Sequence, residues 1–284
     1  MPEIDGHRED VLTEAVSRRI NAERIVLLGW SRAILLQLAH PLVAAGVSAH
    51  SSFRGGPIAT ASRLHHTVRA MLALTFGGDA MREAALDGIR AIHRRVHGRL
   101  PAAAGRFPEG TPYSAEDPAL LLWVHVTLIE SVVLVYELTV APLTSDERNR
   151  YCAEASSVAI ALGARDAEVP RTWNALRACL DATYASGSIA VSGQARELAA
   201  AVLAPPMARV IWPATWANRL VTIGLLPDEV RRQYGFAWSP SRERARVRLL
   251  RVLAGMRRLS PALLTQWPES RAPRDRRTPL PSAR

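Results

Sequence analysis

The sequence predicts an all-α protein, a single globular domain of about ten helices. Two observations support this fold class. Apolar and polar residues almost never alternate with the period of two that marks a half-buried strand. Residues that begin and end helices recur along the chain instead. The apolar share of 48% over 284 residues is enough to form a sizeable core.

Local residue patterns mark the helix ends. Asp117-Pro118 fits an N-cap residue followed by proline at the first helical position. Thr144, with Glu147 three residues later, fits a capping box, and Pro57 and Pro170 suit the first turns of two further helices. Glycines stand where helices should stop, at Gly77-Gly78, Gly98 and Gly163. The pattern predicts helices, some of them merging, over residues 10–23, 24–39, 42–50, 58–75, 79–97, 118–141, 146–162, 170–185, 193–203, 207–223, 227–234 and 241–258.

The net charge of +10 is concentrated near the C-terminus. Residues 231–284 hold 14 arginines against three acidic residues, a net charge of +11, so the remaining chain carries −1. This distribution excludes a uniformly basic nucleic-acid-binding domain, and we expect no nucleic-acid partner. All 36 basic residues are arginine, which excludes every mechanism that needs a lysine amine.

Composition also predicts the domain limits and the compartment. We expect one helical domain over residues 1–260 and a basic, proline-rich, disordered tail over residues 261–284. The N-terminus is charged and lacks the apolar stretch of a signal peptide. Cys152 and Cys179 are too few for a disulfide framework and suit a reducing compartment, so we expect a cytoplasmic protein.

The apolar segment 119–143 is long enough to span a bilayer, which takes roughly 20 residues. It contains His125, Glu130 and Glu137, however, and the two glutamates lie seven residues apart on one helix face. Carboxylates within a membrane are costly. We therefore expect the central helix of a soluble bundle, with its polar groups directed at a functional site.

Eight histidines are present, most of them within apolar helical segments. Buried imidazoles need partners, so such a set indicates a metal or a cofactor. His93 and His97 lie four residues apart on the helix that starts at Asp79. His93 falls at the edge of the apolar stripe and His97 near the polar face, so His93 is the better candidate for an inward ligand.

Three more regions offer candidate site residues. Arg63 and Thr67 share one helix face, with His66 beside them, and an arginine and a hydroxyl one turn apart suit an anion such as a haem propionate. A salt bridge and a threonine bonded to its own helix are the alternative. His40 closes one helix before Pro41, and His50 precedes a loop of small residues of the kind that edges a pocket. His125 lies on the most apolar helix, where pairing with a core hydroxyl or carboxylate is the alternative.

Several ordered blocks together resemble one family, over about residues 20–240. The blocks are Leu35–Pro41, Val43–Val47, His50–Phe53, Arg63 with Thr67, Phe76-Gly77, Ile92-His93 with Val96 and Gly98, Tyr113–Ala115, Asp117-Pro118 and Leu122–Leu128. They are similar to the mpaB-type oxygenases, a family that includes the latex-clearing (rubber) oxygenases.

The resemblance implies an all-α fold that encloses haem b. His93 would be the axial ligand of the iron, and Arg63, His66 and Thr67 would bind the haem. The remaining candidates, His40, His50 and His125, would lie near the pocket and polarise bound O2. The implied reaction is oxidative cleavage, or another oxidation, of an apolar and isoprenoid-like small molecule.

Two departures from the rubber-cleaving branch argue against rubber itself as the substrate. That branch uses a distal lysine, and this chain has none. It also carries an acidic residue upstream of its pocket arginine, and no Asp or Glu lies between Val47 and Arg63 here.

Two other kinds of function stay open from the sequence. A helical bundle could hold a non-haem metal through imidazole and carboxylate ligands, with His93, His97, His125 and Glu130 as candidates. The protein could instead bind haem or lipid without catalysis. The helix from Arg242 to Arg258 places Leu249, Leu250, Leu253 and Met256 on one side and arginines on the other, which suits peripheral contact with an anionic membrane.

Overall fold

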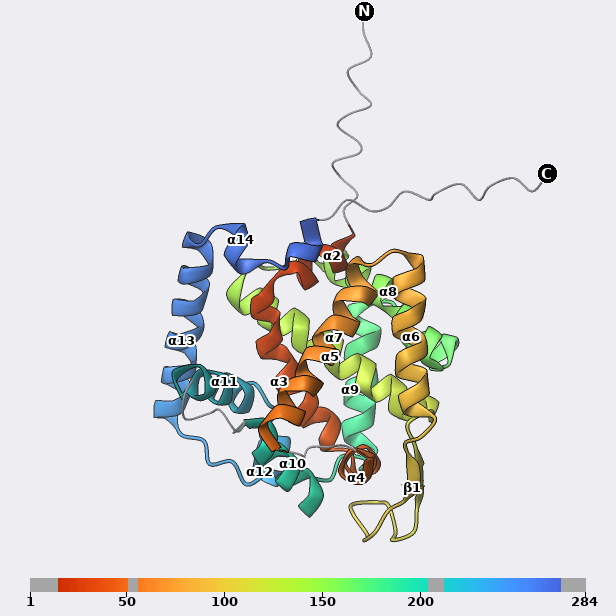
Figure 1. Ribbon diagram of the computed structural model, residues 1–284. Helices are drawn as coiled ribbons and strands as arrows, with labels where there is room; N and C mark the ends of the chain where they lie inside the picture. Colours follow the sequence, from red (N-terminus) through yellow and green to blue (C-terminus); the bar gives the residue numbers. More distant parts are fainter. Residues whose placement is uncertain (1–14, 51–55, 204–211, 272–284) are drawn as a thin grey trace, which may run out of the picture.

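The computed structural model describes residues 15–50, 56–203 and 212–271, with side chains described from residue 66 onward within 56–76. Most of the described chain is helical, with only one small two-stranded sheet, which confirms the predicted fold class (Figure 1). Its helices are α2 (Val16–Ala22), α3 (Leu27–Leu38), α4 (Pro41–His50), α5 (Gly56–Phe76), α6 (Asp79–His93), α7 (Pro118–Thr139), α8 (Ser145–Leu162), α9 (Trp173–Ala185), α10 (Gly193–Leu203), α11 (Trp212–Gly224), α12 (Asp228–Gln233), α13 (Pro240–Leu259) and α14 (Ala262–Thr265). Short 3-10 turns are η2 (Arg24–Val26), η4 (Asp166–Glu168) and η5 (Pro268–Arg271), and the strands are β1 (His97–Arg99) and β2 (Pro112–Ser114).

The centre of the fold is α7, which packs against α3, α8, α9 and α13. A helix surrounded on all sides is apolar around its whole circumference, and for this reason α7 resembles a membrane span in length and hydropathy. Of its most apolar window, 72% is buried inside the protein, which supports the predicted central helix. The helical segments 24–38 and 41–50 are long and apolar enough to span a membrane only if they are counted as one span. The two segments are bent by 105° relative to each other.

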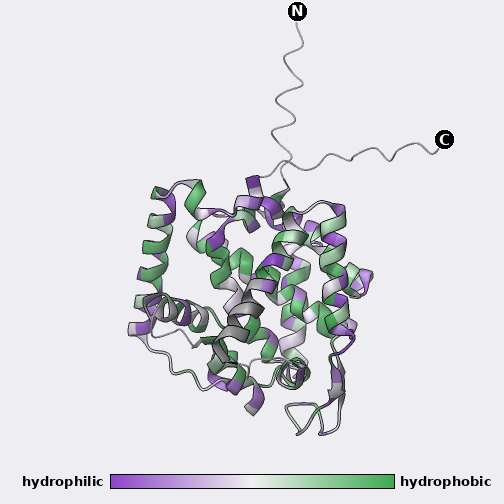
Figure 2. Ribbon diagram, viewed as in Figure 1, coloured by the Kyte–Doolittle hydropathy of each residue, from purple (hydrophilic) through white to green (hydrophobic). Residues whose placement is uncertain are grey.

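Close packing between α3 and α7 depends on Gly29. A Cβ atom at this position would lie 2.5 Å from the backbone oxygen of Ser131. Glycine therefore lets the two helix axes approach closely. The resulting core joins α3 and α7 with residues of most other helices, and Figure 2 shows hydrophobic residues on these helices.

The predicted helix ends at Gly77, Asp117, Thr144 and Gly163 are confirmed, whereas α9 begins at Trp173, after the N-cap Thr172, and not at Pro170. Asp117 caps α7 by accepting a hydrogen bond from Ala119 N at 2.9 Å. Thr144 and Glu147 form the capping box of α8, which ends at Gly163 with a φ of 113°. These contacts lie within four residues of each other, so the sequence contains the whole signal.

The predicted helix over 79–97 is too long. The helix ends at His93, and the chain continues into β1, which pairs antiparallel with β2, with Gly98 opposite Tyr113. A Cβ atom at Gly98 would lie 2.6 Å from the Tyr113 hydroxyl, so this pairing requires glycine. Strands of three residues are too short to show a period of two, and the sequence therefore did not reveal them.

The predicted disordered tail from residue 261 is wrong for its first part. Residues 262–271 form α14 and η5, which pack near α2. Trp267 N donates to the Ala22 carbonyl at 3.0 Å, and Gln266 Nε2 donates to Glu23 Oε1 at 2.9 Å. Parts of the predictions for residues 10–14, 207–211 and 272–284 lie outside the described residues.

Both cysteines are free, as expected. Cys152 is buried and Cys179 is half-buried. Burial raises the pKa of the Cys152 thiol to about 11 and also raises the pKa of Cys179. Both thiols therefore stay protonated at neutral pH and act as small apolar side chains.

Candidate functional site

His93 lies at the C-terminal end of α6 with a half-buried ring. Its Nδ1 atom is buried and has no hydrogen-bond partner in the described part of the protein. Burial lowers the pKa of His93, and the negative charge of Glu116 opposes this shift only in part. The imidazole is therefore neutral at pH 7 and keeps a lone pair available for a ligand.

The chain after His93 forms a corner with the end of α4. His50 Nε2 donates to the His97 carbonyl at 3.0 Å, and the His50 ring meets the Tyr113 ring edge-on, with centroids 6.4 Å apart. A Cβ atom at Gly46 would lie 3.2 Å from Val96, so α4 packs directly on this segment. The fold thus brings His50 close to the end of the helix that carries His93. His50 itself is exposed.

Tyr113 is a neighbour of the candidate residue His50 that the sequence spacing did not predict. Its ring is buried against an apolar cluster formed by Leu42, Ala45, Leu100 and Leu120. Burial raises the pKa of its hydroxyl, which therefore stays protonated. Tyr113 occurs in one of the ordered sequence blocks, but nothing local to that block indicates its contact with His50.

His40, between α3 and α4, is buried beside the Phe107 ring, with centroids 5.1 Å apart. Its Nδ1 atom has no hydrogen-bond partner among the described residues. Burial lowers the pKa of His40 to about 4, although the Asp117 carboxylate opposes the shift. This imidazole is therefore also neutral at pH 7.

His125 is buried on α7, and its Nε2 atom lacks a hydrogen-bond partner in the described chain. Burial lowers the pKa of His125 to about 4. The neighbouring hydroxyl does not pair with it, because Thr127 Oγ1 donates to the Trp123 carbonyl at 2.8 Å. The indole Nε1 of Trp123 is buried without a partner among the same residues. His125 Nε2 and Trp123 Nε1 are therefore two further buried polar atoms on α7 without a described hydrogen-bond partner.

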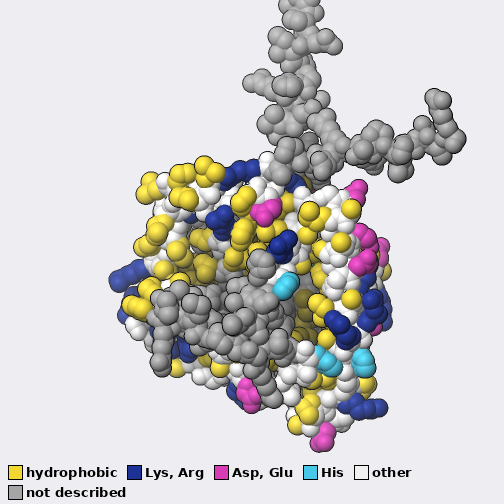
Figure 3. Space-filling model, in the orientation of Figure 1, with side chains coloured by type: hydrophobic (Ala, Val, Ile, Leu, Met, Phe, Trp, Pro, Cys, Tyr) yellow, Lys and Arg dark blue, Asp and Glu magenta, His cyan; other side chains and the backbone are white. Residues whose placement is uncertain are grey.

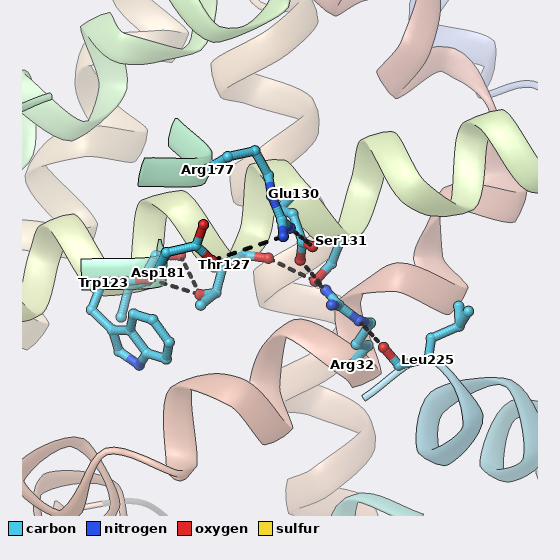
Figure 4. Close-up of polar contacts among 9 residues, drawn as sticks. Arg32, Trp123, Thr127, Glu130, Ser131, Arg177, Asp181 and Leu225 are labelled. Carbon is cyan, nitrogen blue, oxygen red and sulfur yellow. Dashed lines mark hydrogen bonds and ion pairs between the residues drawn. The ribbon is translucent and has the colours of Figure 1, made fainter. Parts of the chain in front are cut away.

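Glu130, a candidate metal ligand from the sequence, is engaged by two arginines in the structure. Its carboxylate forms ion pairs with Arg32 of α3 and, at 2.8 Å, with Arg177 of α9 (Figure 4). Arg32 also donates to Ser131 Oγ at 2.6 Å and to the Leu225 carbonyl at 2.7 Å. The carboxylate thus joins three helices, and each of its oxygens accepts a hydrogen bond from an arginine.

Glu137, on the same helix, is used in a similar way. It accepts from Arg148 Nε at 2.9 Å and from Leu143 N at 3.2 Å. Both carboxylates of the predicted central helix therefore stabilise packing. Their ion pairs explain how α7 accommodates two glutamates.

The other predicted residues lie on α5, which packs against α6. His66 and Thr67 have exposed side chains. The side chain of Arg63 lies outside the described part of the structure. Because α5 and α6 are neighbours, the helix that carries Arg63 and Thr67 lies beside the helix that carries His93 (Figure 1).

A non-haem metal centre finds little support in this arrangement. The described residues contain no group of three or more His, Cys, Asp or Glu side chains that could hold an ion. His97 is exposed on β1, and Glu130 is occupied by two arginines. His93 and His125 therefore lack the additional ligands that this alternative required.

Comparison with known families identifies the chain. A family model described as the catalytic domain of the ER-bound oxygenase mpaB/B'/rubber oxygenase matches residues 17–258, from α2 to α13. The chain belongs to this family. The mpaB/rubber oxygenase domain therefore makes up most of the protein, and the protein is an oxidoreductase of the oxygenase class. Searches of curated proteins and of solved structures found no match.

The family resemblance implies haem, and the side chains of this mpaB/rubber oxygenase domain fit it. Buried polar atoms are normally hydrogen-bonded, yet imidazole nitrogens of His40, His93 and His125 have no partner in the described residues. Neutral imidazole is a suitable ligand for haem iron, and the lowered pKa of His93 favours that form. The donor set is therefore appropriate for a haem protein.

Proposed function

We propose that this protein is a haem b-dependent oxygenase that uses O2 to cleave or otherwise oxidise an apolar, isoprenoid-like small molecule. One observation carries the proposal. In this oxygenase domain, α6 ends at His93, whose half-buried imidazole is neutral. The Nδ1 atom of His93 is buried and has no described hydrogen-bond partner. We assign His93 as the axial ligand of the iron.

The haem, when bound, supplies an iron that binds and activates O2. Arg63 would place a planar guanidinium against a haem propionate, with the Thr67 hydroxyl one helical turn away. His66 would add a second hydrogen-bond donor. Because α5 lies beside α6, these residues and His93 can act on one cofactor.

His40 and His125 would act as neutral donors and acceptors. Burial keeps His40 and His125 uncharged, so each ring offers one N–H and one acceptor nitrogen. Nδ1 of His40 and Nε2 of His125 have no partner among the described residues and could orient a ligand. The ring of His50 is fixed by its hydrogen bond to the His97 carbonyl, which leaves Nδ1 to interact with a ligand.

Apolar surroundings favour an apolar substrate. The residues next to His40 and Tyr113 form a cluster of Leu42, Ala45, Leu100 and Leu120, with Phe107 packed against it. Apolar side chains of this kind exclude water and would favour a hydrocarbon chain as the neighbouring ligand. We do not extend the proposal to rubber, because the chain has no lysine to take the distal position of that branch.

The absorbance spectrum of the purified protein tests the cofactor. Cells supplied with a haem precursor should give a protein with a Soret band and a pyridine haemochrome of the b type, at close to one haem per chain. Absence of the band, both in the purified protein and after hemin titration, would overturn the proposal.

Two matched variants test the ligand. The haem content of purified His93→Ala should be at least tenfold lower than that of the wild type. His97→Ala removes an exposed imidazole four residues away and should keep the haem. An unchanged spectrum in His93→Ala would remove His93 from this role.

Squalene can serve as the probe of the reaction. The haem-loaded protein should consume O2 and form carbonyl products from squalene. Loss of this activity in haem-loaded His125→Phe would support a distal role for His125.

A further inference from the structure

Exposed apolar side chains gather on one side of the molecule, away from His93. Ten large apolar side chains are exposed in the described residues, and seven of them lie on α11, α13 and α14. We call these seven the α13 surface: Trp212, Trp216, Val252, Met256, Leu259, Leu263 and Leu264. Leu259 is 88% exposed and Leu263 is 71% exposed. Figure 3 shows hydrophobic side chains over α13 and α14 with basic side chains beside them.

The geometry of α13 turns its apolar residues outward. At about 100° per residue, Val252, Met256 and Leu259 form one stripe, on the side of the helix opposite Leu250. Leu250 is buried, and the same inner side packs on α7 and α11. The predicted single apolar side of this helix is therefore divided: Leu250 belongs to the core, and Met256 points into solvent.

A second stripe of α13, beside the apolar one, consists of arginines. Its members are Arg244, Arg248, Arg251 and Arg258. All four are exposed, and none forms a hydrogen bond or ion pair with a described residue. The inward arginines of the same helix differ, because Arg246 pairs with Glu243 and Arg257 with Glu23. The helix thus keeps its outward charges uncompensated next to an apolar stripe.

A pocket of about 370 Å³ lies at the edge of this surface, between α11 and the start of α13. Trp216 belongs both to the pocket and to the α13 surface. Aromatic rings of Phe236 and Trp238 line it, together with Arg219 and Arg242. A lining of aromatic rings and guanidinium groups suits a group with an anionic head and an apolar body.

We propose that the α13 surface docks the protein on an anionic lipid bilayer. Leucine, valine and methionine side chains would enter the boundary between headgroups and acyl chains. The tryptophans would lie at headgroup depth, where their amphipathic rings are favoured. The arginine stripe would lie along the lipid phosphates. The proposal uses none of the residues assigned to haem, so it stands independently of the proposed oxygenase activity.

Charge distinguishes the bilayer from a second copy of the chain. A two-fold contact through α13 would bring the arginine stripes of two copies together. The acidic residue of this helix, Glu243, is already bound by Arg246 and by Trp238 Nε1. Like charges without acidic partners oppose such a dimer, whereas anionic lipid supplies the opposite charge over the whole stripe.

Vesicle co-sedimentation of the full chain tests the proposal. The vesicles are phosphatidylcholine alone, or phosphatidylcholine with phosphatidylglycerol, at physiological salt. Binding to the anionic vesicles should be at least tenfold stronger. Val252→Ser/Met256→Ser/Leu259→Ser should reduce that binding at least tenfold. Arg244→Gln/Arg248→Gln should weaken it by about fivefold for each arginine removed.

Matched controls come from other faces of the protein. Met81→Ser removes a methionine on α6 that is exposed to the same 60% as Met256. Arg165→Gln/Arg171→Gln removes two exposed charges that are paired with Glu168 and Asp166. Both should bind as the wild type does. Circular dichroism and thermal melting should show all variants folded, which the exposure of the changed side chains favours.

Three results would overturn the inference. Equal vesicle binding by the wild type and the triple α13 variant would exclude the apolar stripe as a membrane contact. Equal binding to neutral and anionic vesicles would exclude the arginine stripe as a contact with lipid phosphates. A dimer in sedimentation velocity that the triple variant abolishes, without any vesicle binding, would identify a second copy as the occupant.

Discussion

Replacement of Glu130 by glutamine should destabilise the protein by about 3 kcal/mol. The Arg32 and Glu130 side chains are only 3% and 10% exposed. Removing one partner of a buried pair leaves the other charge uncompensated, which costs about 3–5 kcal/mol. Glutamine keeps one acceptor oxygen, so the lower end of that range applies.

Glu137→Gln is the matched control on the same helix. Its ion pair with Arg148 is more accessible, with side chains 22% and 29% exposed, and such pairs contribute about 0–1 kcal/mol. Urea denaturation at pH 7 measures both changes. With a slope of about 3 kcal/mol/M, Glu130→Gln should lower the midpoint by roughly 1 M and Glu137→Gln by no more than about a third of that.

A double-mutant cycle isolates the pair. Arg32→Met/Glu130→Leu should cost about 2 kcal/mol less than the sum of the two single changes, because the double variant leaves no buried charge from the pair. Additive single effects, or equal effects of Glu130→Gln and Glu137→Gln, would refute the assignment of Glu130 to a buried structural ion pair.

Three further predictions concern packing and pH. Gly29→Ala places a methyl group 2.5 Å from an α7 carbonyl oxygen and should destabilise by about 1–3 kcal/mol, whereas Gly88→Ala, with open space around it, should stabilise by up to about 1 kcal/mol. The Thr144 backbone N–H and then Arg19 lower the pKa of Glu147 to about 2, so the wild type should lose stability relative to Glu147→Gln as pH falls from 4.5 to 2. Burial lowers the pKa of His125 from 6.5 to about 4, so the unfolded chain binds the extra proton first. Stability should fall between pH 6.5 and 4, and less so in His125→Gln.

Denaturation curves across this pH range measure the last two predictions, and curves at pH 7 measure the first. A stabilising Gly29→Ala would contradict the close approach of α3 and α7. Parallel pH profiles for the wild type and Glu147→Gln would remove the capping box as an acid-sensitive element. A His125→Gln profile that matches the wild type would mean that His125 can take up its proton within the folded protein.

Local signals explain what the sequence could predict. The caps at Asp117 and Thr144 depend on partners within three residues, so both helix starts were found. The end of the helix at His93 was misplaced because the pairing of Gly98 with Tyr113 joins residues 15 positions apart. A three-residue strand leaves no periodic pattern to detect.

Long-range partners decide which polar residues are free to act. Glu130 and His125 lie five residues apart on the same apolar helix, and the sequence offered both as site residues. The structure differs for the two: arginines 98 and 47 positions away bind Glu130, whereas His125 Nε2 has no described partner. No pattern within α7 carries this distinction.

The contacts of Glu23 make the two ends of the folded chain one unit. This carboxylate is 3% exposed, and it is held by Arg257 and Gln266 from the far end of the sequence. Trp267 N also bonds to the Ala22 carbonyl. A protease that removes the chain after residue 260 would withdraw two of these contacts and loosen α2 as well. Among the described helices, we expect α2 and α14 to open together, so that a cut near one of them should also loosen the other.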